Sequence, residues 1–235
     1  MKLIRRAAVS ALAAVALVIA PAASADAANV SFDVTKLTAD NLVVSDSNCK
    51  YFNVYLKYRS SGTDSWTVMP EIIGRHGYAG DLFFASTFRP NDVDRGMVCP
   101  SSDGLGKYTL GPSEVTAENY SGDYYDHYAG TDHTKGSFYV RGKAYASLST
   151  KRSGKTVTLT STTKVYSPED YGKVNYNPKV KFQVKSGSKW KTIKTVSAKK
   201  GKATLKVTSK GKKTYRVTFD QVSWATGATS KTAKR

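Results

Sequence analysis

The sequence predicts an all-β protein made of two antiparallel β-sandwich domains that follow a cleaved signal peptide. Apolar and polar residues alternate in many short runs, and a period of two puts one set of side chains on a buried face and the other in water. No segment keeps the 3.6-residue period of an amphipathic helix. Charge changes abruptly near Ala146, which indicates two domains rather than one.

The first 25 residues have the composition of a secretory signal peptide. A basic start that contains Arg5 and Arg6 is followed by an apolar stretch over residues 7–20 and by Ala23-Ser24-Ala25, an A-x-A cleavage pattern. The apolar stretch is shorter than the roughly 20 residues that a membrane-spanning helix needs. We therefore expect a mature chain that starts at Asp26, has no membrane span and is secreted, either free in the extracellular space or associated with the cell wall.

Cys49 and Cys99 are the two cysteines of the chain. An exported protein folds in a compartment that permits disulfides, so the sequence predicts one bridge between them. The alternative is a reactive thiol pair or half of a metal site. It is disfavoured because the chain has no Cys-x-x-Cys and no histidine beside either cysteine.

The N-terminal domain is expected over residues 26–145. Residues 50–59 give its strongest strand pattern, because every second residue from Phe52 onward is apolar or aromatic. Pro70 predicts a bulge or a sheet edge, since proline cannot donate to a ladder. The remaining strand candidates are short runs bounded by turn residues, at 29–36, 41–45, 66–73, 81–87, 95–99, 107–110 and 137–145.

A Ser/Thr/Lys/Gly stretch over residues 146–154 predicts a linker, and the second domain is expected over residues 155–235. Val180, Phe182 and Val184 alternate there with polar neighbours, which predicts a half-buried strand. A turn at 186–188 makes this strand the first arm of a hairpin that ends at Val196. Further strands are expected at 156–163, 203–208 and 214–222.

Five segments of this domain form a series: 154–160 (GKTVTLT), 180–184 (VKFQV), 190–196 (WKTIKTV), 201–207 (GKATLKV) and 215–219 (YRVTF). In this order they resemble a small immunoglobulin-like β-sandwich module of actinobacterial secreted proteins, over about residues 150–229. Asp220 stands where the family usually has glycine, and Ser161 where a glycine often ends the first strand. The resemblance implies an immunoglobulin-like fold and a role as spacer, adhesive unit or binding module. It implies no catalytic residue.

Positive charge is the strongest functional feature of the sequence. Residues 146–235 hold 22 lysines and arginines against three aspartates and glutamates, whereas residues 26–145 hold 11 against 15. Such a surface attracts polyanions by releasing their counterions. We expect the lysines to gather on the solvent face of one sheet and to bind an anionic cell-wall polymer, an acidic polysaccharide or extracellular nucleic acid non-specifically. The candidate residues are Lys179, Lys181, Lys185, Lys189, Lys191, Lys202 and Lys206.

A second interpretation is that these lysines block edge-to-edge pairing and keep the protein soluble. The sequence leaves both interpretations open. Trp190, Tyr215 and Phe219 fall in phase with the predicted core, so no exposed stacking platform for bases is expected.

Acidic residues and histidines gather in a Tyr/Gly/Asp-rich segment over residues 119–136, which we interpret as a loop. Its Asp123, Asp126 and Asp132 are weak candidates for calcium ligands. Their spacing matches neither an EF-hand calcium loop nor a zinc motif on a helix. The sequence therefore predicts no metal site and no cofactor.

The chain has no Gly-x-Ser-x-Gly motif, and its C-terminal domain holds three acidic residues. We expect a secreted, non-enzymatic binding or structural protein whose C-terminal domain holds it to an anionic surface. Two alternatives stay open. One is a secreted hydrolase with a catalytic N-terminal domain and a cationic targeting module, and the other is a calcium-binding extracellular module.

Overall fold

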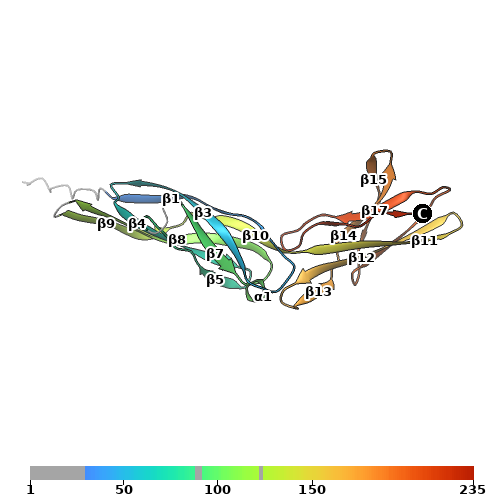
Figure 1. Ribbon diagram of the computed structural model, residues 1–235, viewed down its shortest axis with the longest axis horizontal. Helices are drawn as coiled ribbons and strands as arrows, with labels where there is room; N and C mark the ends of the chain where they lie inside the picture. Colours follow the sequence, from blue (N-terminus) through green and yellow to red (C-terminus); the bar gives the residue numbers. More distant parts are fainter. Residues whose placement is uncertain (1–29, 88–91, 122–123) are drawn as a thin grey trace, which may run out of the picture.

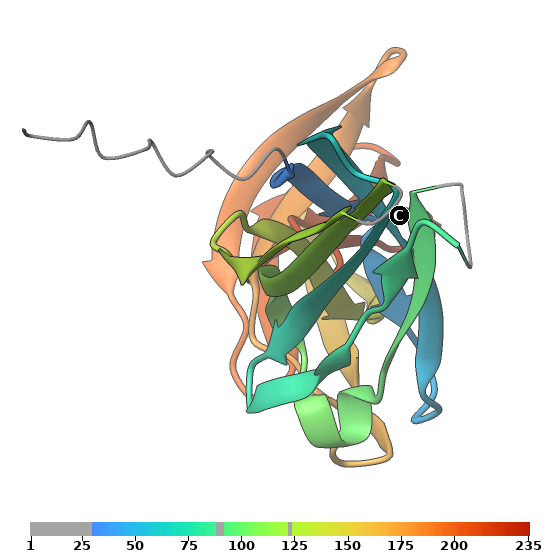
Figure 2. The same cartoon turned by 90° about the vertical axis from the view of Figure 1, so that its left-hand side faces the viewer.

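The computed structural model describes residues 30–87, 92–121 and 124–235. The signal peptide predicted over residues 1–25 lies outside the described residues. Two β-rich halves follow one another along the longest axis of the molecule (Figure 1), and the N-terminal half stands in front of the C-terminal half in Figure 2. The protein is all-β, as predicted, and the single helical element of its described part is the one-turn α1 (Pro100–Asp103).

The N-terminal half is built from two sheets. One has the strand order β1-β3-β7, and the other has the order β2-β10-β8-β4-β5, with β6 pairing to β4 and β9 to β8. Neighbouring strands are antiparallel except β2 and β10, which are parallel. The strands are β1 (Ser31–Ala39), β2 (Leu42–Val44), β3 (Lys50–Ser61), β4 (Ser65–Gly74), β5 (Gly77–Asp81), β6 (Phe84–Ala85), β7 (Val93–Val98), β8 (Gly106–Ser121), β9 (Tyr124–Asp132) and β10 (Gly136–Gly142).

The N-terminal core lies between these two sheets. Alternate residues of β3 are buried, as its sequence pattern predicts. Tyr108 of β8 and Phe138 of β10 are fully buried, with ring centroids 5.2 Å apart. The Tyr108 hydroxyl donates a hydrogen bond to the Gly104 carbonyl at 2.7 Å, so the buried polar atom is satisfied.

Two local predictions for this half are confirmed. The register of β4 against β8 shifts between Pro70 and Ile72, which is the bulge that a strand proline requires. Cys49 and Cys99 form a disulfide. The bridge lies just outside the last pair of the β3–β7 ladder, Lys50 with Val98, and fastens the end of that ladder.

The C-terminal half is a second sandwich of two sheets. One sheet has the order β11-β12-β13, with β16 also pairing to β12, and the other has the order β15-β14-β17-β18, with β19 pairing to β17. The edge strands β15 and β16 contact each other although they belong to different sheets. The strands are β11 (Ala144–Ser153), β12 (Thr156–Ser167), β13 (Gly172–Asn175), β14 (Lys179–Ser186), β15 (Lys189–Ser197), β16 (Lys202–Thr208), β17 (Thr214–Phe219), β18 (Ala228–Thr229) and β19 (Ala233–Lys234).

The C-terminal core is separate from the first. Leu159, Val180, Phe182 and Val217 are fully buried in it, and none of its residues belongs to the N-terminal core. The alternation of β12, β14 and β17 places these side chains between the sheets and leaves mainly lysine, threonine and glutamine outside. The predicted pair of β-sandwiches is therefore confirmed.

The linker predicted over residues 146–154 is wrong. β11 pairs with β12 along its whole length, from Ala144 opposite Val165 to Ser153 opposite Thr156. The Ser/Thr/Lys residues are the polar face of this strand, whereas Ala146 and other small apolar residues pack against the core. A polar strand and a linker share the same composition, and only pairing with a partner strand separates them.

The chain passes from one sandwich to the other at Gly142 and Lys143. The Gly142 amide donates to the Trp224 carbonyl at 2.9 Å, and the Lys143 amide donates to the Val44 carbonyl at 2.8 Å. The Lys143 carbonyl accepts from the Tyr166 amide at 2.9 Å. A Cβ atom at position 142 would collide with the Tyr166 carbonyl, so the close approach requires glycine. Hydrogen bonds to both halves therefore hold the junction.

The segment 119–136, interpreted as a loop, belongs mainly to a ribbon of β8 and β9, whose tip extends beyond the last β4–β8 pair, Ser65 with Glu118. Glu118 pairs with His127, and Tyr120 pairs with Tyr125, whose rings lie 5.2 Å apart. Aromatic pairs of this kind stabilise a ribbon whose faces are exposed. The ribbon forms the end of the molecule that lies farthest from the C-terminal half (Figure 1).

Candidate functional site

The candidate lysines occupy both sheets of the C-terminal sandwich. Lys202 and Lys206 lie on β16, which pairs with β12. The expectation of a single lysine-rich sheet face is therefore wrong, because lysine alternates into solvent on strands of either sheet. The other five lie on β14 and β15 of the opposite sheet, and they are Lys179, Lys181, Lys185, Lys189 and Lys191.

The three carboxylates of this half neutralise little of its charge. Asp220 forms an ion pair with Lys181, with 2.6 Å between Oδ2 and Nζ. Asp170 accepts a hydrogen bond from a nearby serine hydroxyl at 2.6 Å. Glu169 lies 3.8 Å from Nε2 of His76 in the other half of the molecule. Lys181 is thus the one candidate lysine paired with any of these three carboxylates, and the cationic field persists around the rest.

Trp190 lies on the outer face of its sheet, and the expectation that it belongs to the core is wrong. The Arg216 guanidinium stacks over its ring, with 4.2 Å between Cζ and the ring centroid. Arg216 also donates from Nε to Oε1 of Gln183 at 2.8 Å. Tyr215 and Phe219, in contrast, are buried as expected.

A β-bulge explains the reversed position of Trp190. Phe182 pairs with Lys194 but Gln183 pairs with Thr192, so Ile193 has no partner on β14. The extra residue shifts the alternation by one, and a bulge of this kind re-aims the side chains around it. Beyond the shift, Lys191 faces the inner side of the sheet, opposite Val184.

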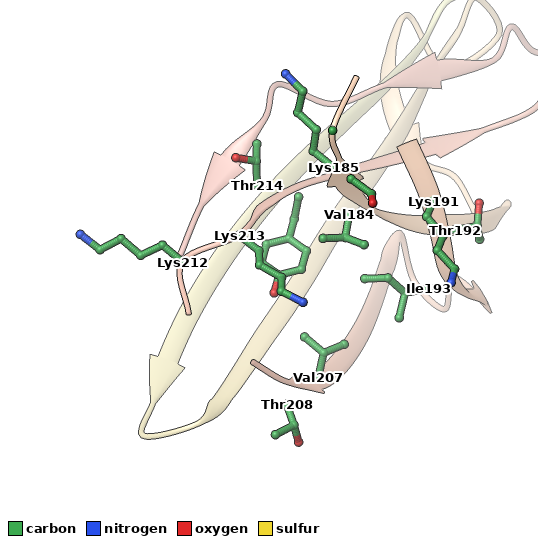
Figure 3. A pocket seen from close by; sticks show the side chains of 13 residues that line it. Val184, Lys185, Lys191, Thr192, Ile193, Val207, Thr208, Lys212, Lys213 and Thr214 are labelled. Carbon is green, nitrogen blue, oxygen red and sulfur yellow. The ribbon is translucent and has the colours of Figure 1, made fainter. Parts of the chain in front are cut away.

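The bulge helps to form a cleft of about 770 Å³ at the β15–β16 side of the sandwich. Half-buried Val184 and Val207, together with Ile193, form an aliphatic surface within it. Figure 3 shows Lys213 directed toward Val184 and Val207 and Lys191 running along β15 beside Ile193, whereas Lys185 and Lys212 extend outward from the border of the cleft. No aspartate or glutamate belongs to the part of the described chain that lines it.

Sequence reasoning missed the aliphatic part of this cleft. Val184 and Val207 fit the core pattern of their strands, and Ile193 sits in a lysine- and threonine-rich run without regular alternation. That irregularity was the one available indication of the bulge. The contact between two edge strands from different sheets is a tertiary feature that no local pattern encodes.

The candidate calcium ligands do not form a metal site in the described part of the chain. Asp123 lies outside the described residues. Both carboxylate oxygens of Asp132 accept backbone hydrogen bonds at 2.8 Å, from the amides of Val34 and Thr134. Asp126 lies on β9, and no cluster of three or more metal-ligating side chains occurs over residues 30–87, 92–121 and 124–235.

Asp132 thus has a structural task, and Asp132→Ala should lower the free energy of unfolding by about 1–3 kcal/mol because it leaves part-buried amides without an acceptor. Asp132→Asn, which keeps one carbonyl oxygen, should lose less. Chemical denaturation with and without calcium measures both effects. A calcium-dependent rise in melting temperature that Asp132→Ala removes would contradict this assignment.

The fold and the cleft together define an all-β protein of two sandwiches with a cationic cleft in the second. No family model and no curated protein matches the sequence. The apo structure of Bacteroides uniformis β-glucuronidase 3 is 12% identical over 85% of this chain and 24% of that chain, with a TM-score of 0.25. The human OSCAR ligand-binding domain is 8% identical over 86% of this chain and 95% of that chain, with a TM-score of 0.28.

TM-scores this low do not establish a shared fold with either protein, and the relation to immunoglobulin-like modules stays a prediction. Within the described residues, no helix has the length and hydropathy needed to cross a bilayer.

Proposed function

We propose that this is a secreted, non-enzymatic binding protein whose C-terminal sandwich associates with an anionic extracellular polymer. The polymer belongs to the class of anionic cell-wall polymers, acidic polysaccharides or extracellular nucleic acid. The observation that carries the proposal is the exposed, largely unneutralised lysine array on β14, β15 and β16. The disulfide agrees with folding in an oxidising, extracellular compartment.

The distribution of lysine over both sheets favours a polymer over a small ion. A flexible polyanion contacts charges on several faces at once, and each neutralised contact releases counterions from the polymer. The N-terminal half is slightly acidic in sequence, so it adds no comparable attraction. Association should therefore depend on the C-terminal lysines and on salt.

The decisive test is co-sedimentation of the mature chain with purified Gram-positive cell walls, paired with titration of double-stranded DNA as a defined polyanion. If the five candidate lysines of β14 and β15 each contact phosphate, DNA affinity should fall by roughly 10²–10³ between 50 and 200 mM salt. Replacing all five with glutamine should flatten the salt dependence and weaken wall binding.

A matched control removes five exposed lysines from the N-terminal side: Lys36, Lys57, Lys107, Lys135 and Lys143. This control changes net charge equally and should leave wall binding close to that of the wild type. Equal losses in the two variants would mean that net charge alone matters. Absence of wall binding at low salt would refute the proposed function.

A further inference from the structure

The cleft combines cationic groups with an aliphatic surface, which a purely hydrophilic polymer does not need. Lys191 and Lys213 line it together with Val184, Ile193 and Val207 (Figure 3). Phosphates and hydroxyls alone would cover the lysines but leave the aliphatic carbons in water. Removing such carbons from water is favourable in proportion to their area.

Among the aliphatic residues of the cleft, Ile193 gives the clearest indication of a ligand with an apolar part. It is the unpaired residue of the β15 bulge, and 39% of its side chain remains exposed. Pairing with the neighbouring strand does not constrain the identity of a bulge residue on an edge strand, and threonine or lysine at this position would favour solubility more than isoleucine does. An isoleucine between Lys191 and Lys194 therefore places apolar surface where a ligand can reach it.

We propose that this cleft binds a single-chain anionic amphiphile, with its phosphate or carboxylate head between Lys191 and Lys213 and its alkyl chain along Val184, Ile193 and Val207. Charge complementarity predicts a negatively charged head group, because lysines line the cleft and no acidic residue occurs among its described lining residues. The volume of about 770 Å³ lies within the range of small-molecule sites. The inference rests on the proposed function, since the same cationic half attracts the anion, but it assigns a separate ligand to one place.

Calorimetric titration of the full mature chain with hexyl, octyl and decyl phosphate, below the concentrations at which they form micelles, tests the cleft. Affinity should rise about two- to fourfold for each added methylene that the cleft buries. Inorganic phosphate should bind far more weakly than decyl phosphate. Equal affinity for hexyl and decyl phosphate would overturn the inference.

Ile193→Ser should reduce the dependence on chain length, and Val222→Ser serves as its control. Val222 is a similarly exposed aliphatic residue, 42% accessible, and does not line the cleft. Because Ile193 is already partly exposed, its replacement should leave the thermal transition nearly unchanged. Retention of the full chain-length dependence in Ile193→Ser would place the ligand elsewhere and refute the assignment.

The double variant Lys191→Gln/Lys213→Gln should weaken every alkyl phosphate by about tenfold, from two surface-exposed charge contacts. Lys151→Gln/Lys164→Gln removes the same charge at two exposed positions outside the cleft and should have little effect. Wall co-sedimentation of the same proteins separates the two proposals. Wall binding without amphiphile binding overturns only the cleft ligand. Amphiphile binding without wall binding overturns only the proposed function. Binding to anionic vesicles but not to monomeric decyl phosphate would mean that the cleft contacts a membrane surface and not a single amphiphile.

Discussion

Phe182→Ala is expected to destabilise the C-terminal sandwich by about 3–5 kcal/mol, while the N-terminal sandwich keeps its stability. Phe182 is fully buried in the centre of β14, and truncation of its ring leaves a cavity that rigid neighbouring strands cannot fill. The two hydrophobic cores share no residue, so the loss should stay within one half. Differential scanning calorimetry should show one transition shifted to lower temperature and the other unmoved.

Ile193→Ala is the control for this experiment. It shortens an aliphatic side chain in the same half at an exposed position, and its effect should stay below about 1 kcal/mol. A single transition that moves as a whole in Phe182→Ala would contradict the independence of the two cores. It would mean that the hydrogen bonds at the junction couple their unfolding.

Replacement of both Cys49 and Cys99 with serine should lower the free energy of unfolding of the N-terminal sandwich by about 4 kcal/mol. The bridge closes a loop with a sequence separation of 50 residues, and its loss restores the freedom of that loop in the unfolded chain. Denaturant titration followed by the fluorescence of Trp66, which lies in the N-terminal core, reports this half when Trp190 and Trp224 of the other half are replaced with phenylalanine.

Chemical reduction of the wild-type protein should reproduce the effect of the double serine variant. The C-terminal transition serves as an internal reference, because that half has no cysteine and should unfold identically with or without reductant. A loss of less than about 1 kcal/mol in both experiments would show that the β3–β7 ladder holds the loop closed without the bridge.

Alternation of apolar and polar residues was sufficient to predict the fold class and most of the strands. It works for β3, β14 and β17 because each has one buried face and one wet face, so the pattern of the sequence is the pattern of burial. The disulfide followed from there being two cysteines in a chain predicted to be exported. These features depend on neighbours in sequence or on simple counting.

The errors all concern contacts that the sequence does not display locally. Residues 146–154 read as a linker because β11 exposes serine, threonine and lysine, and its partner β12 is what makes it a strand. Trp190 read as core because one unpaired residue, Ile193, shifts the phase of β15. The cleft could not be predicted from the sequence for the same reason, since it exists only where the shifted edge strand β15 approaches β16.

A single residue, Lys143, separates β10 from β11, so the chain leaves no flexible spacer between the two sandwiches. With Gly142 and Lys143 hydrogen-bonded to both halves, the tyrosine-bearing β8–β9 ribbon lies at a fixed distance from the lysine-bearing C-terminal sandwich. A flexible tether would let that ribbon sample all directions. Under the proposed function, this junction would instead hold the ribbon at one distance and in one orientation relative to the anionic polymer, so a partner of the ribbon would meet it at a defined position.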